Sequence, residues 1–191
     1  PISGGTGTGK TTVLNAFAAL LPPIERIIVI EDTAELQLNQ PNLLRFEARR
    51  EQPGVAAVPI RDLLRATLRH RPDRIIVGEV RGGEAFDLLQ ALNTGHSGTL
   101  STIHANSAHQ ALARFSSCVL QSGVELPYKA IRHQIADSIQ LLLHLERRQG
   151  QRTATELLRV IGYDTERDRY LTESVENSGL LGLSSATAVT S

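Results

Sequence analysis

The most constraining feature of this chain is a glycine-rich loop at its start, Gly4-Gly5-Thr6-Gly7-Thr8-Gly9-Lys10-Thr11. It matches the pattern G-x-x-x-x-G-K-[ST], in which backbone N–H groups curl around phosphate oxygens because glycine tolerates conformations that a side chain forbids. Residues 10–21 have apolar side chains at helical spacing before Pro22 and Pro23, so the loop leads into a helix N-terminus that favours an anion. The sequence therefore predicts a nucleotide-binding loop in which Lys10 reaches the β- and γ-phosphates and the Thr11 hydroxyl ligates Mg²⁺.

Helices and short buried strands alternate along the rest of the chain. Residues 26–30 and 74–77 are continuous apolar runs rich in β-branched side chains, which is typical of strands buried on both faces. We expect helices at 10–21, 60–69, 84–93, 108–119 (capped by Ser107) and 128–136, further strands at 43–48, 99–103 and 138–145, and a hairpin from 156–163 and 169–171. This order predicts an α/β fold with a mostly parallel sheet and helices on both faces.

The length of 191 residues suits one domain with a substantial core. We expect this domain to cover residues 1–171, because residues 172–191 are rich in Ser, Thr, Gly and Ala and are typical of a flexible tail. The chain contains no methionine, and Ile2 stands where the last residue of a strand normally precedes such a loop. The first strand is therefore expected to be largely missing at the N-terminus.

Composition excludes several classes of protein. The formal net charge is zero and charged residues make up 21% of the chain, which argues against wholesale disorder and against a protein that coats nucleic acid. The single cysteine, Cys118, excludes an intramolecular disulfide and a cysteine-cluster metal site. No apolar run approaches the ~20 residues of a membrane span. We therefore expect a cytoplasmic protein, peripheral to a membrane through its partners.

Acidic residues follow two of the predicted buried strands. Glu31 and Asp32 end the first strand, Glu35 follows shortly after, and Glu79 ends the second. In an open α/β sheet such carboxylates point into the ligand crevice, where one can hold Mg²⁺ and another can orient or deprotonate water. The local pattern does not say which of Glu31, Asp32 and Glu35 act, and a solvated strand-end acid is the alternative for Glu79.

A third strand brings a hydroxyl and an imidazole to the same edge of the sheet. Thr102 and His104 can hydrogen-bond a γ-phosphate, although a packing histidine is the alternative. Arg81 follows Glu79 closely and is a candidate for a phosphate or subunit contact, whereas the arginines of residues 45–50 are ambiguous. No pair of histidines has metal-ligand spacing, so Mg²⁺ should arrive with the nucleotide. Ordinary surface or packing roles are expected for His70, His109, His133 and His144.

The order of the motifs resembles that of the secretion or traffic ATPases, which serve type IV secretion and conjugation, type II secretion, and type IV pilus assembly and retraction. The matching segments are GGTGTGKTT, IEDTAEL, RHRPDRIIVGEVRGGEA and TGHSGTLSTIHANS, and the resemblance covers about residues 2–145. It implies a RecA-like P-loop NTPase core that uses ATP and Mg²⁺ in a homo-hexamer, beside inner-membrane secretion or pilus-assembly components. Thr33, where the pilus-retraction and type II enzymes usually have proline, favours the type IV secretion or conjugative branch, as does the absence of a four-cysteine zinc module.

The resemblance also implies a role for each motif. Gly4–Thr11 matches the Walker A motif, residues 30–36 match the Asp box, residues 75–79 match a Walker B motif that ends in Glu, and residues 95–104 match the His box. The catalytic residues implied are Glu79, Glu35 and His104, and the Mg²⁺ ligands are Thr11, Glu79 and Asp32. The expected nucleotide contacts are Gly4, Gly5, Thr6, Gly7, Thr8, Gly9, Lys10, Thr11, Thr12 and Arg81.

Other functions remain open. Within the family, the alternatives are a type IV pilus or tight-adherence motor and a type II secretion motor. The family's N-terminal domain supplies arginines and one wall of the site and is not part of this chain, so a nucleotide-gated interaction module without turnover is a further alternative. A helicase-like motor is disfavoured because aromatic residues are only 4% and no basic stretch is interleaved with them. No direct sequence-specific nucleic-acid binding is expected.

Overall fold

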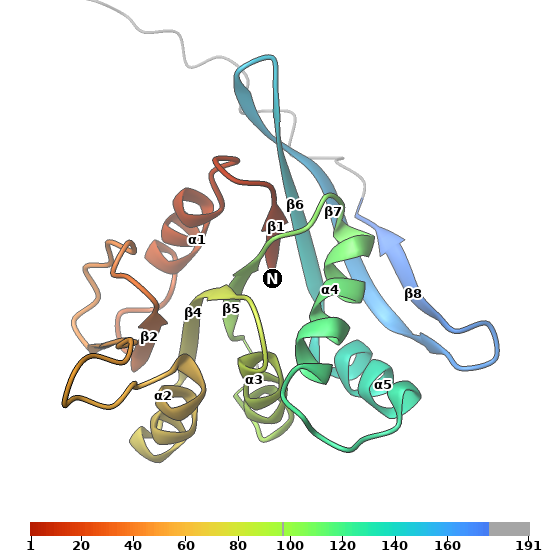
Figure 1. Cartoon of the computed structure of the whole chain (residues 1–191). Helices are drawn as coiled ribbons and strands as arrows, with labels where there is room; N and C mark the ends of the chain where they lie inside the picture. The colour runs from red at the N-terminus through yellow and green to blue at the C-terminus, as the bar shows by residue number, and fades with distance from the viewer. Residues whose placement is uncertain (97, 176–191) are drawn as a thin grey trace, which may run out of the picture.

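The computed structural model describes residues 1–96 and 98–175. Within them the chain forms one eight-stranded sheet in the order β3-β2-β4-β5-β1-β6-β7-β8 (Figure 1). Strands β3, β2, β4, β5, β1 and β6 run parallel, and β7 and β8 join antiparallel at one edge, so the predicted mostly parallel sheet is confirmed. The strands are β1 Ile2–Gly4, β2 Ile27–Glu31, β3 Leu43–Glu47, β4 Arg74–Val80, β5 Leu100–Ile103, β6 Leu141–Arg148, β7 Gln151–Asp164 and β8 Arg169–Ser174.

Helices cover both faces of the sheet, as predicted, but unequally. Alternate residues of β2 face opposite sides: Ile27 belongs to an apolar cluster with Leu14 of α1, whereas Ile28 belongs to the larger cluster on the other face. Among the described residues, α1 packs on the first face and α2 to α5 pack on the second, where neighbouring helices contact one another (Figure 1). No helix among them is long and apolar enough to cross a membrane. The helices are α1 Lys10–Ala19, α2 Ile60–Thr67, α3 Glu84–Asn93, α4 Ala108–Leu120 and α5 Tyr128–Ser138, with a 3₁₀ turn at Leu68–His70.

Most elements lie where the sequence predicts them, and Ser107 caps α4 by accepting a 3.1 Å hydrogen bond from Gln110 N. The strand expected at 138–145 is wrong at its start, because Ser138 still belongs to α5. The Ser138 hydroxyl donates a hydrogen bond to Gln134 O, one turn earlier in the helix. Strand β8 continues to Ser174, beyond the expected domain boundary at 171. Of the expected tail, residues 176–191 lie outside the described residues.

The β6–β7 hairpin is longer than the sequence predicts and extends past the body of the protein (Figure 1). Its end pairs Arg147 with Arg152 and Arg148 with Gln151, and these side chains are exposed. Because solvent surrounds both faces of these strand ends, no alternation of apolar and polar residues marks them in the sequence.

The carboxyl ends of β1, β4 and β5 meet at one edge of the sheet. Strand β1 leads into the glycine-rich loop, β4 carries Glu79 near its end, and β5 ends directly before His104. The register between β4 and β5 shifts between Val77 and Val80, a stretch that contains Glu79. An irregularity of this kind bends a strand and re-aims its side chains, so the fold itself sets the direction of Glu79.

Candidate functional site

The glycine-rich loop is shaped by its contacts with β6 and by left-handed backbone. A Cβ added at Gly4 would lie 2.5 Å from Leu145 O, so only glycine allows the loop to pass this close to β6. Gly9 adopts a φ of 93° at the N-cap of α1, a conformation that favours glycine. Thr8, which is buried, donates a 3.0 Å hydrogen bond to Gly5 O and closes the loop. The loop amides therefore surround the N-terminus of α1, as a phosphate site requires.

Lys10 lies inside the loop and is nearly buried. Its Nζ donates to Gly4 O at 3.0 Å and to Gly5 O at 2.9 Å, and it lies 3.4 Å from His104 Nε2. Burial lowers the pKa of Lys10, and the nearby Glu79 carboxylate partly opposes this effect. The ammonium group is thus held at the mouth of the loop, beside the ends of β4 and β5.

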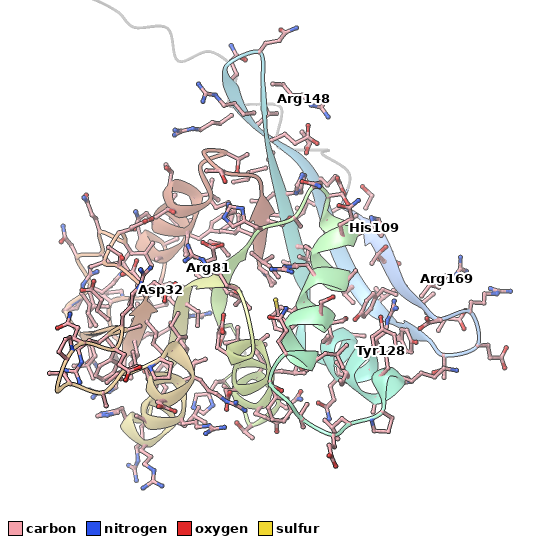
Figure 2. The ribbon with its side chains drawn as sticks, in the orientation of Figure 1. Asp32, Arg81, His109, Tyr128, Arg148 and Arg169 are labelled. Atoms are coloured by element: carbon pink, nitrogen blue, oxygen red, sulfur yellow. The ribbon has the colours of Figure 1, made fainter. Side chains whose placement is uncertain are left out.

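Glu79 is held between two basic groups from different parts of the chain. Its Oε1 lies 3.0 Å from His104 Nε2, and its Oε2 accepts a 2.8 Å hydrogen bond from the Arg81 guanidinium. Arg81 also donates to Asp32 Oδ2 at 3.0 Å, and Figure 2 shows Arg81 and Asp32 at this edge of the sheet. The hydrogen bond to Glu79 raises the pKa of Arg81, so this guanidinium remains charged and bridges the two acids.

Glu31 has a structural role that the sequence pattern does not reveal. It is buried, and its Oε1 accepts 3.0 Å hydrogen bonds from both Glu35 N and Leu36 N. The carboxylate therefore pairs with two backbone N–H groups of the segment that follows β2, and this fixes Glu35 beside the cavity. Thr102 is similarly engaged, because its hydroxyl donates to Gly78 O at 2.6 Å.

A cavity of about 310 Å³ opens between these groups. Its walls include eleven of the residues expected from the sequence, namely Thr6, Gly7, Lys10, Thr11, Glu31, Asp32, Glu35, Glu79, Arg81, Thr102 and His104. Gly4, Gly5, Thr8 and Gly9 shape the loop without lining the cavity, and Thr12 is exposed on α1 outside it. The sequence did not assign Arg50 or Thr33 to the site, yet both line the cavity. Arg50 belongs to the ambiguous arginine-rich stretch, and no local signal places its side chain here.

Oxygen ligands suited to Mg²⁺ converge on one side of the cavity. Thr11 Oγ1 and Glu35 Oε2 are 3.4 Å apart, which is close to the ~3 Å between neighbouring ligands of an octahedral Mg²⁺ ion. Asp32 contributes a further carboxylate, although its Oδ2 is engaged by Arg81. The donor set of hydroxyl and carboxylate oxygens therefore fits Mg²⁺.

Comparisons with known proteins place this geometry in context. Residues 2–180 match the family model described as type II/IV secretion system protein. The type IV secretion system protein PtlH of Bordetella pertussis is 45% identical over 156 residues, which cover 78% of this chain and 45% of PtlH. The conjugal transfer protein TrbB of Rhizobium radiobacter is 39% identical over 175 residues, covering 90% of this chain and 50% of TrbB.

A solved structure agrees with these matches. The crystal structure of the VirB11 ATPase from the Brucella suis type IV secretion system, in complex with sulphate, superposes with a TM-score of 0.74 at 34% identity. The match covers 82% of this chain and 46% of that one. The chain thus spans about half the length of the relatives it matches.

Proposed function

The chain belongs to the type II/IV secretion system protein family, and we propose that it binds Mg-ATP and hydrolyses it to power macromolecular export or conjugative transfer through a type IV secretion system. The relatives named above are a type IV secretion protein and a conjugal transfer protein, which supports this branch over a pilus-assembly or type II motor. The VirB11 protein of Brucella suis, whose structure superposes on this chain, is itself named as an ATPase.

One observation carries the proposal: three groups that the chemistry needs are joined by successive close contacts in the wall of the cavity. Lys10 Nζ lies 3.4 Å from His104 Nε2, which lies 3.0 Å from Glu79 Oε1. A phosphate that contacts Lys10 and the loop amides therefore has His104 and Glu79 as its neighbours. A cation, a neutral or charged imidazole and a carboxylate in this order can bind the terminal phosphate and activate the water that attacks it.

Nucleotide binding rests on the loop and on the oxygen ligands beside it. Lys10 and the amides of Gly4–Thr11 hold the phosphates, while Thr11 and the carboxylates of Asp32 and Glu35 hold the cation. Mg²⁺ held by these residues would supply neutralisation of the phosphate charge. Arg81, which the two acids Asp32 and Glu79 fix in place, adds a positive group at the rim of the cavity.

The water-activating role falls to Glu79. Its side chain is largely buried, and both of its oxygens have partners that set its orientation. The carboxylate accepts the proton of the attacking water or orients it, and His104 donates a hydrogen bond to the terminal phosphate. Glu35, fixed through its own N–H by Glu31, holds the cation from the other side.

The working assembly that we propose is a homo-hexamer on the cytoplasmic side of the inner membrane. The ring contacts the secretion components there, and hydrolysis moves its subunits against one another. Because the chain spans about half of its relatives, these assembly and location statements concern the whole protein.

The test is phosphate release from Mg-ATP by this chain and by its Glu79→Gln variant, with nucleotide binding measured alongside. Glu125→Gln makes the same change at an exposed position outside the cavity and serves as the matched control. The proposal expects turnover to fall by about 10²–10⁴-fold in Glu79→Gln while binding persists. Binding without turnover in every variant would instead favour a nucleotide-gated module, and equal turnover in parent and Glu79→Gln would contradict the assignment of Glu79.

A further inference from the structure

A second group of potential ligands lies at the root of the β6–β7 hairpin. His144 and Glu146 belong to β6 and Glu156 belongs to β7; together they are called the hairpin cluster here. One ring nitrogen of His144 and one oxygen of each carboxylate lie within 4.8 Å of one another. None of the three residues lines the nucleotide cavity, so the cluster is separate from the site described above.

The strand register brings the hairpin cluster together. Glu156 pairs directly with His144, and Glu146 follows His144 by two positions and so shares its face of β6. The register shifts between His144 and Leu145, because Thr155 is an extra residue on β7. A bulge of this kind bends the strands locally and re-aims their side chains. The three side chains therefore converge through the pairing of two consecutive strands.

Ser3 engages Nδ1 of His144, which leaves Nε2 as the ring nitrogen nearer to Glu146. His144 is 1% exposed, and its Nδ1 lies 2.9 Å from Ser3 Oγ, which in turn donates to Leu143 O at 3.4 Å. In the tautomer in which Ser3 donates its proton to Leu143 O, the Ser3 oxygen accepts the Nδ1 proton of His144. The lone pair then resides on Nε2, which lies 3.8 Å from Glu146 Oε1, beyond the reach of a hydrogen bond.

The two carboxylates are oriented by contacts of their own. Glu146 accepts hydrogen bonds from Arg148 Nε at 2.6 Å and from Thr155 Oγ1 at 3.3 Å. Glu156 Oε2 accepts the N–H of Ala108, the first residue of α4, at 3.2 Å. Partners of this kind fix metal ligands in place, and oxygens with spare lone pairs remain on both side chains. The buried imidazole and the two partly exposed carboxylates thus bring three electron-pair donors close together, an arrangement that a cation stabilises.

We propose that the hairpin cluster binds a divalent transition-metal ion of the Zn²⁺ class through His144 Nε2 and one oxygen each from Glu146 and Glu156. Imidazole together with carboxylate is a ligand set that suits such ions better than Mg²⁺ or Ca²⁺. Zinc bonds of about 2.0–2.2 Å place neighbouring ligand atoms roughly 3.3 Å apart, so the glutamate side chains converge slightly on binding. Water completes the coordination.

The position of the cluster defines what the ion does. Ser3 immediately precedes the glycine-rich loop, and Ala108 begins the helix that follows His104. A bound ion therefore joins the root of the hairpin, whose end carries Arg148 in Figure 2, to the two segments that border the nucleotide cavity. Its role is structural, and it takes no part in the chemistry at Glu79.

The test is a calorimetric titration of the folded chain with ZnCl₂, in the parent and in four single variants. Glu146→Gln removes one ligand at a partly exposed position that the fold tolerates, and His144→Gln removes the imidazole. His109→Gln is the matched control for a nearby exposed histidine, and His104→Gln removes binding at the nucleotide cavity. Circular dichroism establishes that each variant is folded.

The proposal expects one zinc ion to bind per chain at saturation, with an affinity that falls at least about tenfold in Glu146→Gln and in His144→Gln. The same binding persists in His109→Gln and in His104→Gln. Loss of this binding only in His104→Gln would assign the ion to the nucleotide cavity and overturn the proposal. Absence of any saturable binding, with His144 doubly protonated in ¹⁵N spectra at neutral pH, would overturn it as well and identify the cluster as an ion pair.

Discussion

Glu79 and His104 meet across two neighbouring strands, with Oε1 of the acid 3.0 Å from Nε2 of the imidazole. The acid comes from the irregular end of β4, and the histidine comes from the residue after β5. The distance between them therefore depends on the β4–β5 pairing, with Arg81 fixing the other oxygen of Glu79. Both side chains also line the cavity, which makes this pair the most direct target for testing the site.

Replacing His104 tests its contact with the terminal phosphate. We expect His104→Gln to lower the rate of phosphate release by about 10²-fold, since one aligned donor to a developing charge contributes on that scale. Nucleotide affinity should change much less. His109→Gln, on the exposed side of α4, should leave turnover unchanged. Equal turnover in His104→Gln and the parent would show that the imidazole only packs beside Glu79.

Two neighbouring glycines of the loop should respond differently to alanine. A Cβ at Gly4 meets Leu145 O at 2.5 Å, whereas the nearest atom to a Cβ at Gly5 lies at 3.8 Å. We expect Gly4→Ala to lower the free energy of unfolding by about 1–3 kcal/mol, because the loop must move away from β6. Gly5→Ala should change it little. Urea unfolding of both variants measures the difference, and similar losses would contradict the close approach of Gly4 to β6.

The structural role of Glu31 can be separated from catalysis. Glu31→Ala removes the acceptor for Glu35 N and Leu36 N and should cost about 1–3 kcal/mol of unfolding free energy. Glu31→Gln retains a side-chain oxygen and should recover most of this stability. Chemical denaturation of the two variants gives the comparison. A loss of turnover in Glu31→Gln without a loss of stability would instead indicate a direct role in the reaction.

Arg50 should contribute to nucleotide binding from the wall of the cavity. We expect Arg50→Gln to weaken the binding of Mg-ATP by about 3–10-fold, the range for one exposed charge near a phosphate. The effect should shrink as salt is added, because exposed charges are screened. Arg69→Gln, at an exposed position away from the cavity, is the control. An effect of equal size in both variants would mean that only the net charge matters.

Tyr163 should make stability fall at alkaline pH. Burial, with a hydrogen bond to Asp168, raises its pKa from 10.0 to about 12. Because the unfolded chain ionises first, the stabilisation from this group is complete below pH 10.0 and is lost as the pH rises towards 12. Urea unfolding across this range should show a steeper decline in the parent than in Tyr163→Phe. Parallel declines would contradict the raised pKa.

The parts of the fold that follow from local pattern were predictable from the sequence. Strands β2 and β4 are continuous apolar runs because the sheet buries them on both faces, and the glycine-rich loop carries its own signature. The order of these elements was enough to bring Glu79 and His104 to one edge. Whether those residues perform the assigned chemistry stays a prediction until turnover is measured.

The parts that depend on distant contacts were not predictable. Glu31, Asp32 and Glu35 look equivalent in sequence, and only the return of Glu31 onto the following backbone separates its role from theirs. Arg50 reaches the cavity from a loop whose path no local signal specifies. His144 meets Glu156 through a register that includes an extra residue, and a single sequence does not mark such an insertion.

The contacts of Lys10 with Gly4 O and Gly5 O have a consequence for the catalytic cycle. A phosphate that binds must replace these carbonyls as the partner of the ammonium group. The free energy gained is therefore only the difference between the phosphate contacts and the carbonyl contacts of Lys10. When the nucleotide leaves, the two carbonyls again accept hydrogen bonds from the ammonium group, so the empty site holds no unpaired buried charge. In the ATPase proposed above, this exchange of partners lowers the net gain from phosphate binding and so favours release of the product over tight retention.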